Sequence, residues 1–223
     1  MNPAMARLTP WMMEIMSDSL ADAGFLITEV NVDAFTSWTQ FYKNIPIGLL
    51  IFVLLCSGIF TAEYQKGTLI PVVTKGLPRR KILAAKAVLL TAMWTGMYFL
   101  CYGITYGYNA YFWDNSIAAH LLFGAACYWL FGIWVIALLV FFSAVSGTNT
   151  NVLLGTGGVV LGVCFLGMFP KLNSVLPVKL MEGMALIQGA AKPEDYYTGM
   201  AAASVTAVIL IALSAICFNR KQL

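Results

Sequence analysis

Long apolar runs, separated by short polar stretches, dominate the chain. Runs without Asp, Glu, Lys or Arg occupy residues 44–62, 87–113, 115–170 and 196–219. A helix needs about 20 residues to cross roughly 30 Å of hydrocarbon. Each run is therefore long enough for at least one membrane crossing.

The run 115–170 is too long for one crossing and contains a polar break, SGTNTN, at residues 146–151. This break predicts a turn between two spans. The alternation of apolar and polar residues that is typical of barrel strands is absent. In lipid, only helices and closed barrels satisfy the hydrogen bonds of the backbone, so the spans are expected to be helices. The pattern predicts an all-α, polytopic transmembrane bundle with five spans, at about 45–62, 85–108, 119–143, 152–169 and 198–218.

Composition agrees with this interpretation. Only 10% of the 223 residues are charged, whereas soluble domains carry about a quarter. All five cysteines fall inside predicted spans and show no CxxC spacing. They indicate neither a disulfide framework nor a zinc site.

Charge is distributed unequally between the two sides of the predicted bundle. The side with loop 63–84, the SGTNTN turn and the C-terminus carries eight Lys and Arg residues and one acid, counting Lys86. The other side carries five Lys and Arg residues and nine acids. Because Lys and Arg concentrate on the cytoplasmic side, we expect a multi-pass cell-membrane protein with a cytoplasmic C-terminus. Residues 1–43 would form an extracellular segment, and 44–223 the membrane domain.

The stretch EYQKGTLIPVVTKGLPRRKILAAK, residues 63–86, holds nearly half of the positive charge. The basic residues at its end can extend toward anionic lipid headgroups. Binding to headgroups is by itself enough to explain this basic cluster. The earlier part contains an apolar patch, which favours a short segment lying at the membrane surface and ready to bind lipid or protein. The patch consists of Leu69, Ile70, Val72 and Val73.

This stretch resembles the cytoplasmic connection of type-2 ATP-binding-cassette (ABC) exporter permeases. The matching positions are Glu63, Gly67, Thr68, Pro78, Arg79, Arg80 and Lys86, and Arg79 stands where the family often has Ser. FTSWTQFYKNIP, residues 35–46, resembles small Gram-positive members associated with antimicrobial-peptide export or immunity.

The resemblance implies a permease whose loop docks on a cytoplasmic ATPase. The implied ATPase-coupling residues are Glu63, Tyr64, Lys66, Gly67, Thr68, Leu69, Ile70 and Pro71. The implied anchor of the next helix consists of Pro78, Arg79, Arg80, Lys81 and Lys86. The family has six spans, so this chain is expected to lack the first.

The resemblance also implies partners: the ATPase, which would bind ATP and magnesium, a second permease copy or related permease, and membrane lipids. The chain itself has no GxxxxGK[ST] motif and is expected to be neither an enzyme nor a binder of cofactors, metals or nucleic acid. The transported substrate would be a hydrophobic compound or peptide. The alternative is a non-transport assembly or sensor subunit whose basic loop binds anionic lipid.

Four further features leave alternatives open. His120, the single histidine, is an interfacial or packed residue, or a pH-sensitive or substrate-contacting one. The aromatic residues of 102–113 form an interfacial belt or line a substrate path. Residues 171–197 predict an amphipathic helix beginning at Pro177. Two GxxxG spacings serve packing within the chain or dimerisation; they are Gly103 with Gly107 and Gly158 with Gly162.

Overall fold

A computed structural model describes residues 34–59, 61, 78–113 and 120–220, and this part of the chain is helical, without strands. Five helices are long and apolar enough to cross a membrane. They confirm the predicted all-α class and the five spans, and by length and composition they are those of a multi-pass membrane protein. They are α2 (Ala34–Cys56), α5 (Arg79–Phe112), α6 (Leu121–Val145), α7 (Asn149–Gly167) and α10 (Tyr197–Arg220).

Two helices extend well beyond their predicted ends. α2 begins at Ala34, 11 residues before the predicted start at 45, because Trp38 and Tyr42 are buried against the other helices and continue its packed face. α5 has 34 residues, which makes it about 50 Å long, more than the hydrocarbon thickness. Hydropathy alone missed both extensions because they include charged residues, such as Lys43, Arg80 and Lys81, which lower the local hydropathy.

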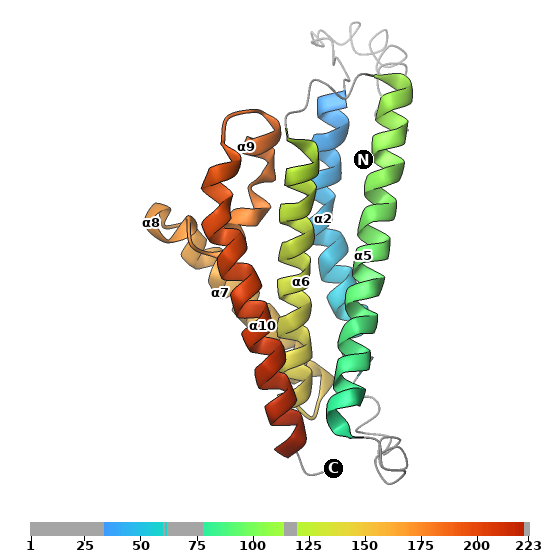
Figure 1. The fold of residues 1–223 in the computed structure, drawn as a ribbon, viewed down its shortest axis with the longest axis vertical. Helices are drawn as coiled ribbons and strands as arrows, with labels where there is room; N and C mark the ends of the chain where they lie inside the picture. Colours follow the sequence, from blue (N-terminus) through green and yellow to red (C-terminus); the bar gives the residue numbers. More distant parts are fainter. Residues whose placement is uncertain (1–33, 60, 62–77, 114–119, 221–223) are drawn as a thin grey trace, which may run out of the picture.

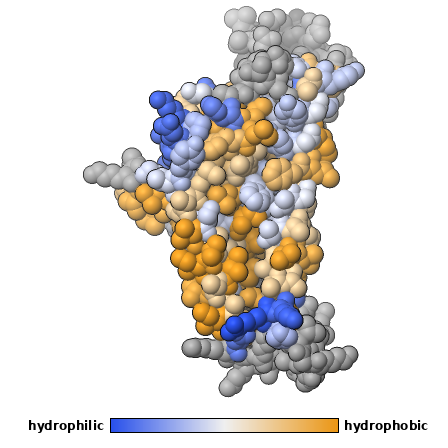
Figure 2. All heavy atoms as spheres, in the orientation of Figure 1, coloured by the Kyte–Doolittle hydropathy of each residue, from blue (hydrophilic) through white to orange (hydrophobic). Residues whose placement is uncertain are grey.

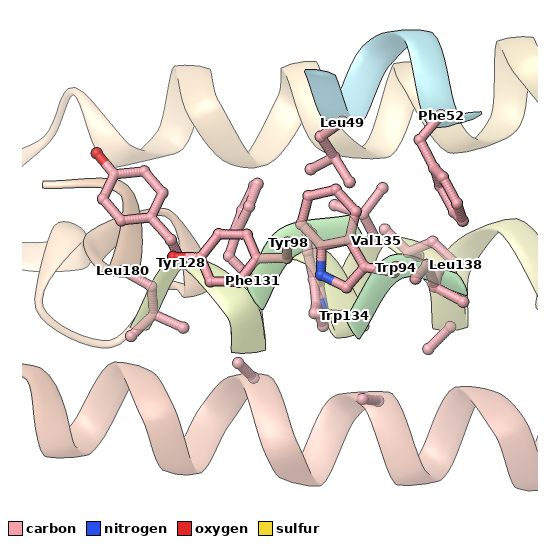
Figure 3. Packing of buried hydrophobic residues seen from close by; sticks show 14 of the residues in the cluster. Leu49, Phe52, Trp94, Tyr98, Tyr128, Phe131, Trp134, Val135, Leu138 and Leu180 are labelled. Atoms are coloured by element: carbon pink, nitrogen blue, oxygen red, sulfur yellow. The ribbon is translucent and has the colours of Figure 1, made fainter. Parts of the chain in front are cut away.

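The helix α6 forms the centre of the bundle. It is apolar on all sides, as expected of a helix surrounded by others, and it contacts α2, α5, α7 and α10 (Figure 1). Its most extensive contact is with α10. The core gathers side chains of several helices (Figure 3), among them Leu49 and Phe52 of α2, Trp94 and Tyr98 of α5, and Phe131, Trp134 and Val135 of α6.

Rings pressed against glycines bring the helices together. A methyl group built on Gly132 of α6 would overlap the Trp94 indole, and one on Gly155 of α7 would overlap the Phe142 ring. Neither glycine belongs to a predicted GxxxG pair. At Gly103, Gly107, Gly158 and Gly162 an added methyl group would meet nothing within 4 Å. The interpretation that these pairs serve packing within the chain is therefore wrong, and dimerisation stays a prediction.

The segment between α7 and α10 folds back into the bundle in short pieces. The pieces are α8 (Pro170–Asn173), the 3-10 helix η2 (Pro177–Met181), α9 (Gly183–Ile187) and the 3-10 helix η3 (Pro193–Tyr196). A helical piece does begin at Pro177, but the prediction of one amphipathic helix is wrong. Leu180, Leu186 and Ile187 are fully buried, so burial against α6 and α10 decides the shape.

Polar residues lie toward the two ends of the surface, and apolar residues dominate between them (Figure 2). Many large apolar side chains on the outer faces of the long helices are exposed, including Leu55, Leu100 and Leu161. Lipid contact explains such faces, which a soluble protein would bury. We call the end with the start of α5 and the end of α10 the inner end, following the predicted orientation, and the opposite end the outer end.

Candidate functional site

The described part of the predicted coupling site is a junction at the inner end. It consists of the end of α2 with residues 57–59 and Thr61, the start of α5 with residues 78–86, and Asn149 at the start of α7. We call it the inner junction. Of the implied site residues, eight lie outside the described residues, namely Glu63, Tyr64, Lys66, Gly67, Thr68, Leu69, Ile70 and Pro71.

Pro78 precedes the first helical residue of α5. Its backbone is extended, with φ −66° and ψ 134°, and its carbonyl oxygen accepts the backbone N–H of Lys81 at 2.9 Å. A proline suits this position because its missing N–H would have no partner in the first turn.

Two of the predicted anchor residues, Arg80 and Lys81, have exposed side chains in the first turn of α5. Cations near a helix N-terminus are disfavoured by the helix dipole, and no acidic residue lies in this turn to offset them. Helix stability therefore does not explain these charges. Their position suits an anionic group outside the described chain, on lipid or on a protein.

Lys86 joins the two helices on either side of the predicted loop. Its Nζ donates to the carbonyl oxygen of Ile59 at 2.7 Å, across 27 residues of sequence. A cation at the end of a helix is favoured by the dipole and by the carbonyls left without partners there. The ammonium thus ties the beginning of α5 to the residues that continue α2.

The end of α2 also reaches α7. A methyl group built on Gly58 would lie 4.0 Å from Nδ2 of Asn149, so the two segments are neighbours. Ser57 is fully buried, and its hydroxyl donates to the carbonyl oxygen of Leu54 at 2.8 Å. The residues that follow α2 are thus joined to α5 through Lys86 and lie near α7 at Gly58.

A polar cluster at the outer end was missed by sequence reasoning. Lys179 and Glu182 form an ion pair at 2.6 Å, and Asn173 donates to the other carboxylate oxygen of Glu182. Tyr196 donates to the Glu182 carbonyl oxygen at 2.9 Å, and Tyr128 donates to the carbonyl oxygen of Met181. We call these groups the Glu182 cluster. The i,i+3 spacing of Lys179 and Glu182 was the available signal.

The aromatic residues after Tyr98 divide between the core and the surface. Tyr102 is buried, with its ring 5.2 Å from that of Trp38, so an interfacial belt does not describe it. Tyr111 is 82% exposed and packs edge-on against Phe112, which fits the belt interpretation. The exposed His120 stands just before α6 in a left-handed conformation, with φ 51°.

Metal-ligating and thiol side chains are scattered over the described ranges. No three His, Cys, Asp or Glu side chains come together there. The five cysteines are free, and Cys56 and Cys127 are buried.

No protein-family model, no curated protein and no solved structure matches the chain. The likeness to ABC exporter permeases therefore rests on the residues quoted above.

Proposed function

We propose that the chain is the membrane permease subunit of an ABC exporter for a hydrophobic compound or peptide. A cytoplasmic ATPase would bind ATP and magnesium and would also bind the loop 63–73 of this chain. The C-terminus of this chain would lie on the cytoplasmic side as well. A second permease copy, or a related permease, would complete the translocation path. The permease itself would perform no covalent chemistry.

The single observation that best supports this proposal is the hydrogen bond from Lys86 to Ile59. A loop that only set the orientation of the spans would need no such tie between the helices before and after it. A loop that receives mechanical work must move the helices on both sides together. Gly58 also lies near Asn149, which brings the start of α7 to the same junction.

Transport would then follow from alternating packing of the helices. When ATP closes the ATPase dimer, the loops would be pushed together, and each inner junction would move as a unit. Packed helices have discrete arrangements and do not deform continuously. The displacement would therefore switch the bundle between two states and change which end is open to the substrate.

Co-purification with a P-loop ATPase encoded beside this chain tests the docking. We expect Glu63→Lys and Gly67→Pro each to reduce ATPase association and ATP-dependent export at least about tenfold, the effect of losing one charged or shape-defining contact. Glu194→Lys, which reverses an exposed acid at the opposite end, is the matched control and should have no effect. Unchanged association and export in both loop variants would refute the proposal.

A second function, a non-transport assembly or sensor subunit that binds anionic lipid, is favoured by the exposed Arg80 and Lys81 in the first turn of α5. It predicts that the double variant Arg80→Gln with Lys81→Gln loses preference for phosphatidylglycerol over phosphatidylcholine in native mass spectrometry. It also predicts that no ATPase is retained by the purified chain.

Orientation is tested separately by thiol labelling. In a variant without the five native cysteines, Lys66→Cys and Lys75→Cys should react with an impermeant maleimide only after the cells are opened. Labelling in intact cells would place the loop outside and remove the basis for ATPase docking.

A further inference from the structure

Three buried polar side chains face the contact between α2 and α5 near the outer end without hydrogen-bond partners. They are Ser37 of α2 and Tyr102 and Asn109 of α5, with exposed fractions of 2%, 7% and 0%. The Ser37 and Tyr102 hydroxyls and both amide atoms of Asn109 lack partners in the part of the chain that the structure describes. We call this group the outer seam.

The positions of these residues place them along one line of contact. The Trp38 ring lies 5.2 Å from that of Tyr102 and 6.4 Å from that of Tyr106. Phe41, one turn after Ser37 and on the same face of α2, has its ring 6.0 Å from that of Tyr102. Asn109 follows Tyr102 by seven residues, two helical turns, and so lies on the same face of α5. The seam therefore runs along the outer part of the α2–α5 contact.

Neighbouring polar groups show that the fold can satisfy such side chains. Tyr98, one turn before Tyr102, donates to the carbonyl oxygen of Ala125 at 2.9 Å, and Tyr42 donates to that of Leu121 at 3.3 Å. Thr105, between Tyr102 and Asn109, donates to the carbonyl oxygen of Cys101 at 2.9 Å. Unpaired polar atoms therefore do not follow from burial near the α2–α5 contact as such, although a few buried hydroxyls elsewhere in the described chain also lack partners.

The unpaired groups of Tyr102 and Asn109 are also the hardest to satisfy locally. Buried serine and threonine hydroxyls elsewhere, such as those of Ser143 and Thr156, can rotate toward a carbonyl one turn back. A phenol reaches beyond its own helix backbone, and a carboxamide needs both a donor and an acceptor. Burying such groups unpaired is unfavourable, and folded proteins rarely do so without a role for them.

We propose that the outer seam is a binding site for a peptide group of a hydrophobic peptide. The NH₂ group of the Asn109 carboxamide can donate to the C=O of a peptide bond, and its carbonyl oxygen can accept from the N–H of the same peptide bond. Tyr102 and Ser37 supply hydroxyls that can donate or accept as the ligand requires. Trp38 and the half-exposed Tyr106 offer aromatic faces to the apolar side chains of the ligand.

This site deepens the proposed function, because it names the substrate class of the exporter. It also accounts for the neutral chemistry of the seam, since all three of its polar residues are uncharged. A charged ligand would find no partner of opposite sign among Ser37, Tyr102 and Asn109. A purely apolar ligand would leave the carboxamide unpaired.

The test measures binding and stability together on the full chain in lipid nanodiscs, without ATPase. The probe is acetyl-Leu-Phe-Leu-amide, followed by tryptophan fluorescence against empty nanodiscs. We expect Asn109→Leu and Tyr102→Phe to weaken probe affinity about 5- to 20-fold each, the effect of one or two lost hydrogen bonds. Their unfolding temperatures should be equal to or higher than that of the native chain, because an unpaired buried polar group is removed.

Tyr98→Phe is the matched control, since it removes a phenolic hydroxyl that is already bonded within the chain. It should lower the unfolding temperature and leave probe affinity unchanged. An analogue of the probe with one amide replaced by an ester should bind the native chain about tenfold more weakly than the amide. Asn109→Leu should not distinguish the two probes.

Two results would overturn the site. One is unchanged probe affinity in Asn109→Leu and Tyr102→Phe, with raised unfolding temperatures, which would make the seam a place for bound water only. The other is equal binding of the amide and ester probes by the native chain. Failure of ATPase association with intact probe binding would instead refute the exporter and leave the site standing.

Discussion

Trp94 of α5 and Trp129 of α6 hold their two helices together by a pair of indole hydrogen bonds. The Trp94 Nε1–H donates to the carbonyl oxygen of Trp129 at 3.3 Å, and the Trp129 Nε1–H donates to Oγ1 of Thr95 at 3.0 Å. Both indoles satisfy their single donor in surroundings where water is scarce. This pairing fixes the register of α5 against the central helix.

Replacing Trp94 by Phe tests the pairing. The variant loses one hydrogen bond and part of a fully packed ring, and we expect the free energy of unfolding to fall by about 2–3 kcal/mol. Reversible unfolding in mixed detergent micelles measures this change. Trp113→Phe, at the half-exposed outer end of α5, is the control and should change stability by less than about 1 kcal/mol. Equal effects of the two variants would contradict the role of Trp94.

Gly132 and Gly158 should respond in opposite ways to replacement by Ala. At Gly132 the new methyl group overlaps the Trp94 indole, and overpacking of this kind should destabilise the chain by about 1–3 kcal/mol. At Gly158 it meets nothing within 4 Å, so the higher helix propensity of Ala should leave stability equal or raise it by up to about 1 kcal/mol. Thermal unfolding of both variants decides the matter, and a destabilised Gly158→Ala would contradict the assignment of an open face.

The open glycine face of α7 also offers a test of dimerisation. If two copies meet through Gly158 and Gly162, replacing both by Ile should block close approach and reduce the dimer fraction at least about tenfold. Cross-linking in native membranes measures that fraction. The control is Leu161→Ile, which changes a neighbouring, strongly exposed side chain without changing its volume. An unchanged dimer fraction in the double variant would leave these glycines facing lipid.

Lys86→Met separates attachment from coupling. Loss of the ammonium leaves the Ile59 carbonyl without this donor, and we expect a stability loss of about 1–2 kcal/mol. ATPase association should persist, because the loop is intact, while ATP-dependent export falls at least about tenfold. Lys43→Met removes an exposed cation of α2 that belongs to neither the junction nor the loop, and it should preserve export. Full export by Lys86→Met would show that the tie does not transmit motion.

The Glu182 cluster should hold the folded-back segment in place. Glu182→Ala removes the acceptor of both Lys179 and Asn173. Because the Glu182 side chain is 42% exposed, solvent screens the ion pair, and we expect a loss of only about 1 kcal/mol. Hydrogen exchange of residues 170–188 should accelerate in this variant and not in Glu194→Ala. Unchanged exchange would mean that Leu180 and its neighbours hold the segment by burial alone.

Several features followed directly from the sequence. The five spans, the helical class and the turn at 146–151 depend on local hydropathy, and a bilayer forces any long apolar run into a helix. The helical start at Pro177 also followed, because a proline restricts its own backbone wherever it stands.

Other features were decided only by the tertiary structure, because they depend on residues far apart in the chain. The start of α2 at Ala34 reflects the burial of Trp38 and Tyr42, which apolar run lengths do not report. The glycines that allow two helices to pack closely are those that face a ring on another helix, such as Gly132. The spacing of glycines along one helix does not reveal which of them face a neighbouring helix. The tie from Lys86 to Ile59 and the unpaired carboxamide of Asn109 likewise exist only once the helices pack side by side.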